Sequence, residues 1–507
     1  MIRNPLGLGL VLFLFIFCCF TFASAEIVPG RYIVRFKASR EAANFSKTSD
    51  LIRSMQAETQ SCLVKVFPKP VRTLAPRVLW AGGAVAVSLA PSELELVKKD
   101  PLVDSVIPVE YRTWIFPTPP LLASEPTFAW GVVKTRAPEV WKTLNINGSG
   151  VLVGHLDSGL VPGHPALAGQ VFRFKDFVAT TTASSIPLDE NGHGSHTAGT
   201  IAGKTDNIGM APGAMLVVAR ILDSNNQGST EQIFAAMQWM LDPDGNPDTN
   251  DFPRVVNNSW GSSDTSDKTF WDIVNTWVKA GIVPVFAAGN NGYDNGKVGV
   301  PAAYPQSCAV GAVNSTDELA FFSSTGPAIW NKITYIKPDV TAPGTNILSV
   351  NFKGGLTGIS GTSMAAPHVS GMIALLLQAN PALTVDEIFR ICRETAVDVG
   401  EKGADNKFGY GRIDAFAAVK KALDAASGTT PLLVLLSRAE ELEMTPGAAH
   451  TDFFERTLRG IIPRATALTE SEWSTLINKL ATDKTGYGKK AIQALSCARR
   501  FRQIHGE

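Results

Sequence analysis

The sequence lacks an excess of charge of either sign. Its 507 residues include 46 Lys and Arg and 46 Asp and Glu, so the formal net charge is zero. Proteins that bind the phosphates of nucleic acids carry an excess of basic residues. We therefore expect no nucleic-acid partner. The apolar content of 45% is ordinary for a folded globular chain.

Cysteine is also scarce, with six residues in the whole chain, of which two lie in the apolar N-terminal run. If the N-terminal region is removed later, an odd number of cysteines remains and at most one intrachain disulfide can form. This excludes a disulfide scaffold. Because Cys308 and Cys392 have apolar neighbours, we expect both to be small buried side chains. The cysteines after the apolar run are Cys62, Cys308, Cys392 and Cys497.

Long hydrophobic runs are absent after residue 22. Arg3 precedes an uncharged run over residues 6–22, and Ala23-Ser24-Ala25 follows. This pattern predicts a signal peptide, residues 1–25, cleaved before Glu26. A retained membrane anchor is the alternative, but the short run and the small-residue site favour cleavage. No later segment is apolar enough to span a bilayer, so we expect a secreted protein, extracellular or in the cell envelope, without stable membrane insertion.

The most informative stretch that is present runs from Gly361 to His368. Ser363 stands there between small residues, just ahead of an apolar run at residues 372–377 that predicts a buried helix. A helix N-terminus favours a developing negative charge. A hydroxyl is a poor nucleophile unless a base takes its proton, so the chain must also supply a base.

Three upstream segments supply the groups that such a serine needs. Asp157 ends an apolar run, which predicts a buried strand with a carboxylate at its C-terminal edge. His193 begins a stretch of small residues that can start a helix, and the Asn290 amide is a neutral donor that could face an oxyanion. Taken singly, each residue could be a cap, a turn residue or a strand end. If the chain had no such chemistry, all four of these structural explanations would have to hold at once.

The order Asp157, His193, Asn290, Ser363 resembles that of the subtilisin-type serine proteases, the subtilases. The resemblance extends from about residue 130 to about residue 425. It implies that Asp157 orients His193, that His193 takes the Ser363 proton, and that Asn290 and the Ser363 N–H face the oxyanion. Three further segments contribute to the resemblance: residues 258–261, 337–344 and 409–415.

The resemblance also implies a substrate site for an extended peptide. Its members are a strand that pairs with the substrate backbone, the wall and floor of the first specificity pocket, and the edge of the outer subsites. In that order they are Ser259, Trp260, Gly261; Ala287, Ala288, Gly289; Gly299; and Gly228. Small uncharged walls predict cleavage after large hydrophobic residues. Thr230 stands where the family often has an aromatic residue, which leaves the outer preference open.

Strand alternating with helix predicts the α/β fold class for residues 129–426, with a mostly parallel sheet between two helical layers; the subtilisin-like three-layer fold is what the resemblance implies. Ahead of it, residues 26–111 predict a small α+β domain of ferredoxin-like type: strands at 31–37, 84–89 and 103–109, and helices at 40–57 and from Pro91. Its position resembles that of the subtilase propeptide, an intramolecular inhibitor and folding aid; an unrelated accessory domain is the alternative.

Two segments connect or extend these domains. Residues 112–128 are rich in proline and predict an exposed linker that contains the maturation site. Residues 427–507 begin at a boundary near Gly428 and predict a helical extension of unknown role, with helical fragments at 432–442, 452–458 and 471–481.

We expect no required cofactor. The stretch 203–212, where the family often has a calcium loop, is shortened. The loop 242–251 has enough oxygen ligands for calcium, but it lacks the spacing of a calcium loop and favours a solvated turn, so structural calcium is unsupported. The sequence therefore predicts a monomeric, secreted serine endopeptidase, made as a self-inhibited precursor and acting on proteins or peptides. A catalytically silent binding protein and a non-peptide serine hydrolase are the alternatives.

Overall fold

A computed structural model describes most of the chain. It covers residues 25–37, 45, 47–68, 76–115, 118, 128–179, 186–293 and 296–426, and in the C-terminal region residues 456–458, 460–462, 468–481, 491–496 and 498–499. The expected signal peptide lies outside the described residues up to residue 24. Within the described part, no helix is both long enough and apolar enough to cross a membrane.

The N-terminal domain has the β-α-β-β-α-β order expected from the sequence, and its strands form an antiparallel sheet in the order β2-β3-β1-β4. The predicted first helix begins later and runs further than expected, because its last turns pack Leu63 and Val66 against the sheet. The elements are β1 (Glu26–Phe36), α1 (Thr48–Val66), β2 (Arg77–Leu79), η1 (Trp80–Gly82), β3 (Ala84–Ser88), α2 (Pro91–Lys99) and β4 (Val103–Thr113).

The exposed linker expected from residue 112 is wrong for residues 112–115. Strand β4 continues to Thr113 and pairs antiparallel with β8 (Gln227–Ser229) of the following domain. Trp114 is only 1% exposed, and Ile115 is buried as well. The reason is that the larger domain offers backbone hydrogen bonds and an apolar pocket to this segment, which local sequence does not reveal.

The catalytic domain expected at 129–426 contains a seven-stranded sheet in the order β14-β11-β10-β9-β5-β7-β6, and all its neighbouring strands are parallel. Apart from the edge strand β6, every residue of these strands is buried, which is why they appear as unbroken apolar runs. The strands are β5 (Leu152–Asp157), β6 (Val171–Asp176), β7 (Met215–Arg220), β9 (Val255–Asn258), β10 (Val283–Ala287), β11 (Cys308–Val313) and β14 (Val340–Pro343).

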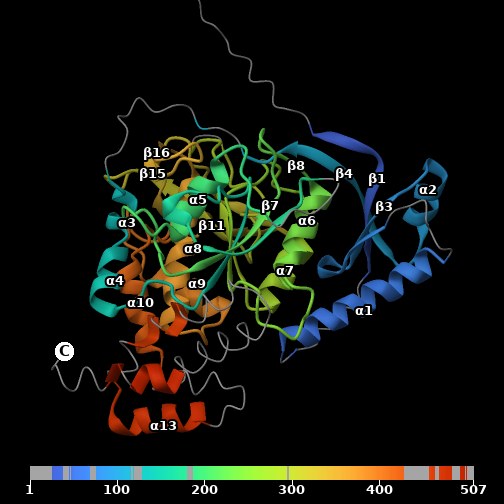
Figure 1. The fold of residues 1–507 in the computed structure, drawn as a ribbon. Helices are drawn as coiled ribbons and strands as arrows, with labels where there is room; N and C mark the ends of the chain where they lie inside the picture. The colour runs from blue at the N-terminus through green and yellow to red at the C-terminus, as the bar shows by residue number, and fades with distance from the viewer. Residues whose placement is uncertain are drawn as a thin grey trace, which may run out of the picture.

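Helices cover both faces of this sheet. On one face, α5 (His193–Ala202) and α8 (Thr362–Ala379) pack on strand residues such as Val153. On the other, α6 (Thr230–Trp239) and α7 (Trp271–Lys279) pack on strand residues such as Leu152, because successive strand residues point to opposite faces. Figure 1 shows the sheet between these layers and the N-terminal domain beside α6 and α7. The three-layer α/β fold is therefore confirmed.

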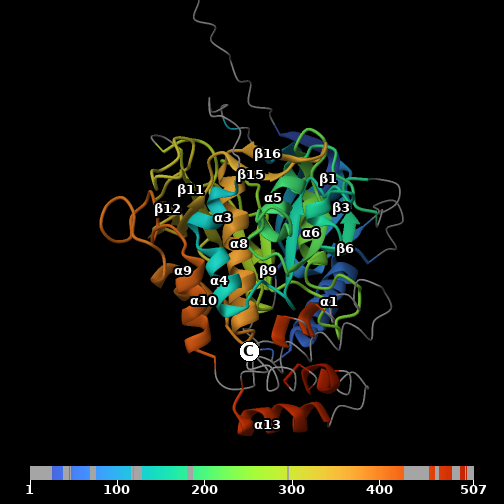
Figure 2. The ribbon, with the colours of Figure 1, turned by 60° about the vertical axis from the view of Figure 1, so that its left-hand side comes forward.

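Shorter elements complete the domain: α3 (Trp130–Lys134), α4 (Ala137–Leu144), η2 (Pro165–Leu167), β12 (Ala328–Trp330), β13 (Ile333–Tyr335), β15 (Ile347–Val350), β16 (Leu356–Ile359), α9 (Val385–Glu394) and α10 (Ala415–Asp424). In the C-terminal region, α13 (Glu470–Ala481) shares a small apolar core with Ile461 and Leu495. Figure 2 shows this region at one end of the larger domain. The predicted helix at 432–442 lies outside the described residues.

The cysteines agree with the absence of a disulfide scaffold. Cys62, Cys308 and Cys392 are free, and the last two are buried. Burial raises the pKa of the Cys392 thiol to about 12, so this thiol is inert. Cys497 lies outside the described residues.

Candidate active site

The sheet and two helices bring the four expected catalytic residues to one edge of the domain. Asp157 ends β5, and Asn290 follows the end of β10 by three residues. Parallel strands end at the same edge of the sheet, where α/β folds place their sites. His193 is the first residue of α5 and Ser363 the second of α8, so both helices begin at this edge.

Asp157 and His193 are joined directly. Asp157 Oδ1 lies 2.8 Å from His193 Nδ1 and also accepts the Ser158 N–H at 2.7 Å. Full burial opposes ionisation of this carboxyl, but the His193 ring and the Ser158 N–H outweigh it and hold the Asp157 pKa below its ordinary value. An ionised Asp157 keeps the proton on Nδ1 and leaves Nε2 as an acceptor. Among the described residues, His193 Nε2 has no hydrogen-bond partner.

A second buried carboxylate, Asp189, shapes the turn that presents His193. It accepts the N–H groups of Asn191 at 3.0 Å, Gly192 at 2.8 Å and Ser195 at 2.8 Å. A carboxylate near a helix start satisfies N–H groups that have no partner within the helix. The sequence analysis missed Asp189; its position four residues ahead of His193, before a helix start, was the signal that could have found it.

The Ser363 hydroxyl is anchored beside the expected substrate strand. It donates to Ser259 O at 3.0 Å, while Ser259 Oγ donates to Ser363 O at 2.8 Å. The Ser363 carbonyl can accept this bond because Pro367, four residues on in α8, has no N–H to donate within the helix. Within the described residues no hydrogen bond joins Ser363 Oγ to His193 Nε2.

The Asn290 amide is held in one orientation. Its Oδ1 accepts the Thr362 N–H and the Thr362 hydroxyl, each at 2.9 Å. The Nδ2 group therefore faces the other way, and a point at the Cβ position of Gly361 would lie 3.6 Å from both Asn290 Nδ2 and Ser363 N. Two donors near the same point beside the Ser363 hydroxyl are the kind of groups that stabilise an oxyanion.

The expected substrate strand already holds a peptide segment of the chain itself. Gly261 donates its N–H to Trp114 O at 3.1 Å, and the Trp114 N–H donates to Asn226 O at 3.0 Å. Trp114 Nε1 also donates to Gly228 O at 2.9 Å. The Trp114 ring packs against Trp260 and Phe270, with centroids 5.5 and 5.6 Å away.

Trp114 and Ile115 lie in the same pocket as most of the expected site residues. None of the described residues that line this pocket carries a charge. Position 299 in this lining requires a glycine, because a Cβ atom there would stand 2.0 Å from Ser262 O. Thr230, which was expected at the outer subsites, accepts the backbone N–H of Glu110 at 3.1 Å. The expected residues in the lining are Ser259, Trp260, Gly261, Ala287, Ala288, Gly289, Asn290, Gly299 and Ser363.

The other histidines of the motifs are packing residues. His196 Nε2 lies 2.9 Å from Ile347 O, and burial lowers its pKa to about 3. His368 Nδ1 lies 2.8 Å from Met364 O, and burial lowers its pKa to about 4. Both rings are therefore neutral at pH 7 and lie within the core. His155 and His164 are buried as well.

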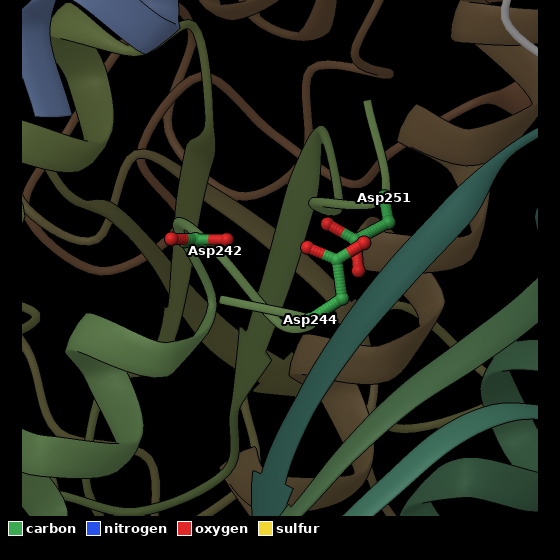
Figure 3. Close-up of side chains that lie close together, drawn as sticks. All are labelled: Asp242, Asp244 and Asp251. Atoms are coloured by element: carbon green, nitrogen blue, oxygen red, sulfur yellow. The ribbon is translucent and has the colours of Figure 1, made fainter. Parts of the chain in front are cut away.

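An acidic cluster lies away from this site. Figure 3 shows the carboxylates of Asp244 and Asp251 next to each other and Asp242 to one side; ligand atoms of all three lie within 4.8 Å of one another. Arg173 Nε lies 2.9 Å from Asp251 Oδ2. The turn is less solvated than expected, because Asp251 is buried, and burial together with the Asp244 charge raises its pKa to about 7.

The sequence of this chain is similar to those of known proteins. The model of the family described as Subtilase family matches residues 148–411. Bacillopeptidase F from Bacillus subtilis (strain 168) is 34% identical over 375 residues, which are 67% of this chain and 26% of that protein. The minor extracellular protease Epr from the same strain is 32% identical, over 63% of this chain and 47% of that protein.

The match to a third relative covers most of both chains. Subtilisin E from Bacillus subtilis (strain 168) is 32% identical over 77% of this chain and 90% of that protein. The chain thus spans about a quarter of Bacillopeptidase F, about half of Epr and nearly all of subtilisin E.

Proposed function

Because the chain belongs to the subtilase family of serine proteases, we propose that it is an endopeptidase that cleaves peptide bonds through Asp157, His193 and Ser363. The observation that carries this proposal is the geometry at the sheet edge. An ionised Asp157 fixes the His193 ring at 2.8 Å, and the acceptor nitrogen of that ring has no partner within the described residues. A general base must have such a free acceptor within reach of its nucleophile.

The reaction follows from these groups. The Ser363 hydroxyl turns from Ser259 O towards His193 Nε2 and gives up its proton as its oxygen attacks the substrate carbonyl. Asn290 Nδ2 and Ser363 N receive the oxyanion. His193 then passes the proton to the leaving amine, an acyl-enzyme forms on Ser363, and water releases it by the same steps in reverse.

We further propose that residues 26–111, together with the segment that continues from them to residue 115, are an inhibitory domain of a secreted precursor. Its tail hydrogen-bonds on both sides, to β8 and to Gly261, and so occupies the place of an extended substrate. The same domain would aid folding, because it contributes four strands to a sheet that ends on β8. A signal peptide at residues 1–25 would direct the precursor out of the cell and would be cleaved before Glu26.

The tail also suggests where maturation occurs. Ile115 lies in the pocket with Ser363, and Thr118 Oγ1 donates to Ser360 O at 2.8 Å, three residues ahead of Ser363. The peptide bonds between Ile115 and Thr118 are therefore the ones that the chain can present to its own nucleophile. After the cut, the tail would remain as a bound product until it dissociates or is degraded.

The uncharged pocket supports a preference for large hydrophobic residues before the scissile bond. Its walls are small residues, and none of the described lining residues could pair with Lys or Arg. We propose that protein or peptide substrates bind here as extended strands, that a monomer suffices, and that no cofactor is required. Profiling the mature protein with a peptide library tests this preference, and dominant cleavage after Lys or Arg would contradict it.

The deciding experiment is N-terminal sequencing of the secreted protein and of its Ser363→Ala variant. We expect the wild type to begin between residues 116 and 118 and the variant to keep the N-terminal domain. Ser315→Ala, at an exposed serine away from the site, is the matched control and should mature normally. Equal processing of Ser363→Ala would refute self-maturation.

Two assays separate the alternative functions. A fluorophosphonate probe should label the mature wild type but not Ser363→Ala; no labelling of either would favour a silent binding protein. Hydrolysis of casein compared with small esters tests peptide specificity, and turnover of esters alone would favour a non-peptide hydrolase.

A further inference from the structure

Two buried polar residues lie beside Asp157 and lead to Oδ2, the carboxylate oxygen that does not contact the His193 ring. They are His155 on β5 and Thr197 on α5, and both are fully buried. His155 Nε2 lies 2.8 Å from Thr197 Oγ1, and Thr197 Oγ1 lies 3.3 Å from Asp157 Oδ2. Burying a polar side chain costs free energy unless it is hydrogen-bonded, so this pair requires an explanation.

The periodicity of a strand and the periodicity of a helix together position these groups. His155 and Asp157 are two residues apart on a strand, so they point to the same face of the sheet. His193 and Thr197 are four residues apart on a helix, so they lie on the same side of it. Because α5 packs on that face of the sheet, the strand pair and the helix pair meet.

The protons of this network can be assigned. Burial lowers the pKa of His155, so its ring is neutral and carries one N–H. Besides His155 Nε2 at 2.8 Å, whose role depends on the tautomer of the ring, the Thr197 hydroxyl has three acceptors for its one proton: Gly194 O at 3.1 Å, His193 O at 3.2 Å and Asp157 Oδ2 at 3.3 Å. The three distances are close, and a hydrogen bond to a carboxylate is about twice as strong as one to a neutral acceptor. The hydroxyl therefore donates to Asp157.

His155 must then donate through Nε2, because the Thr197 oxygen has become the acceptor. Its Nδ1, which has no partner among the described residues, is left as a lone pair instead of an unpaired N–H. Unpaired buried acceptors are tolerated better than unpaired donors. The two Asp157 oxygens then have different side-chain partners: Oδ1 binds His193, and Oδ2 accepts from Thr197 within the described residues.

We propose that Thr197 and His155 are positioning residues that fix the Asp157 carboxylate and so hold His193 in its reactive orientation. This inference rests on the triad of the proposed function. Neither residue touches the substrate position. Without the Thr197 hydroxyl, the carboxylate can rotate about its own axis and its hydrogen bond to the ring weakens, which costs turnover and leaves substrate binding unchanged.

The test compares Thr197→Val with Thr197→Ser in the mature enzyme on a peptide substrate. Valine keeps the shape and loses the hydroxyl, whereas serine keeps the hydroxyl and loses a methyl group. We expect Thr197→Val to lower kcat about tenfold or more with KM unchanged, and Thr197→Ser to stay within about twofold of the wild type. If Thr197 only fills space, the order reverses, and that result or equal values would overturn the proposal.

His155→Leu tests the second residue. Alone it should lower kcat, but it should have no further effect in the Thr197→Val background, because it acts only through that hydroxyl. Independent, multiplying losses would overturn its role. His155→Gln, which can still donate, should restore part of the activity lost in His155→Leu, and a failure to do so counts against the proposal.

A readout without turnover covers variants that do not mature. In the full-length Ser363→Ala precursor labelled at histidine, the His193 Nδ1 proton in its bond to Asp157 should give a far-downfield proton resonance. Thr197→Val should move this resonance upfield or speed its exchange with water, and Thr197→Ser should not. An unchanged resonance in both would refute the positioning role. Residual proteolysis by Ser363→Ala itself would instead refute the triad, so the two failures are distinguishable.

Discussion

Replacing Trp114 by alanine should release the tail of the N-terminal domain from the cleft without unfolding either domain. The Trp114 side chain is 1% exposed, and its ring packs against Trp260 and Phe270. A buried tryptophan removes about 150–250 Å² from water, worth about 4–6 kcal/mol at about 25 cal/mol per Å². Truncation to alanine typically costs about 3–5 kcal/mol, because the site relaxes in part.

Most of this cost falls on local opening of the tail, since the N-terminal domain has its own core around Val34 and Val85. Amide hydrogen exchange measures it directly in the Ser363→Ala precursor, which cannot cut itself. The Gly261 N–H, which donates to Trp114 O, should lose protection by about 10²–10⁴-fold, as about 3–5 kcal/mol requires at 1.36 kcal/mol per tenfold.

Tyr111→Phe is the matched control on the same strand. It removes only the hydrogen bond of the Tyr111 hydroxyl to Asp223 at 2.6 Å, which is worth about 1–3 kcal/mol, and should change protection much less. If Trp114→Ala leaves the Gly261 amide as protected as before, the tail is not held by its tryptophan. If protection falls equally throughout β1 and β3, the variant has unfolded the domain and the local account is wrong.

Three further predictions concern chemistry, acid stability and metal. Asn290→Ala should lower kcat by about 10²–10³ with little change in KM, a range already known for this donor in subtilisin; an unchanged kcat would remove Asn290 from the oxyanion site. Burial opposes ionisation of Asp339, but the buried Lys337 and the half-buried Arg393 outweigh it and lower its pKa. Its contribution to stability is therefore present above the unfolded pKa of about 3.9 and is lost as pH falls through the folded value. Asp339→Asn should cost about 3–5 kcal/mol in urea unfolding at pH 7, because Lys337 loses its buried partner, and should flatten the pH dependence below about pH 4; a variant as stable as the parent would contradict this. Removing calcium with EDTA should leave Tm unchanged, because Arg173 already supplies a cation to Asp251; a Tm that falls with EDTA and recovers with calcium would show a metal site.

The sequence was sufficient to predict the parallel α/β fold of the larger domain and to select Asp157, His193 and Ser363, which the structure brings to one edge of the sheet. Buried parallel strands appear as short apolar runs, and β5 ends at Asp157 as expected. Asp157 and His193 could be found because each stands at the end of such a pattern, where a strand stops or a helix starts. These features depend on neighbours within a few residues.

The parts that sequence did not reveal depend on contacts between distant segments. No residue near Thr362 in the sequence indicates that Thr362 binds the Asn290 amide, 72 residues away. Likewise, no residue near position 112 indicates that Trp114 is buried against the larger domain. The proline-rich composition of that segment is typical of an exposed linker, and the prediction failed where the larger domain supplied partners.

For this protein the sequence by itself determined which chemistry is present: a serine, a histidine, an aspartate and an amide in the order of one family, on a parallel α/β scaffold. Only the tertiary structure decided how these groups are held. It brought His155 and Thr197 next to the Asp157 carboxylate, and it placed Trp114 and Ile115 in the pocket that contains Ser363. The physical reason is that composition and periodicity act locally, whereas the partner of a buried polar group or ring is chosen by whatever the fold brings within a few ångströms.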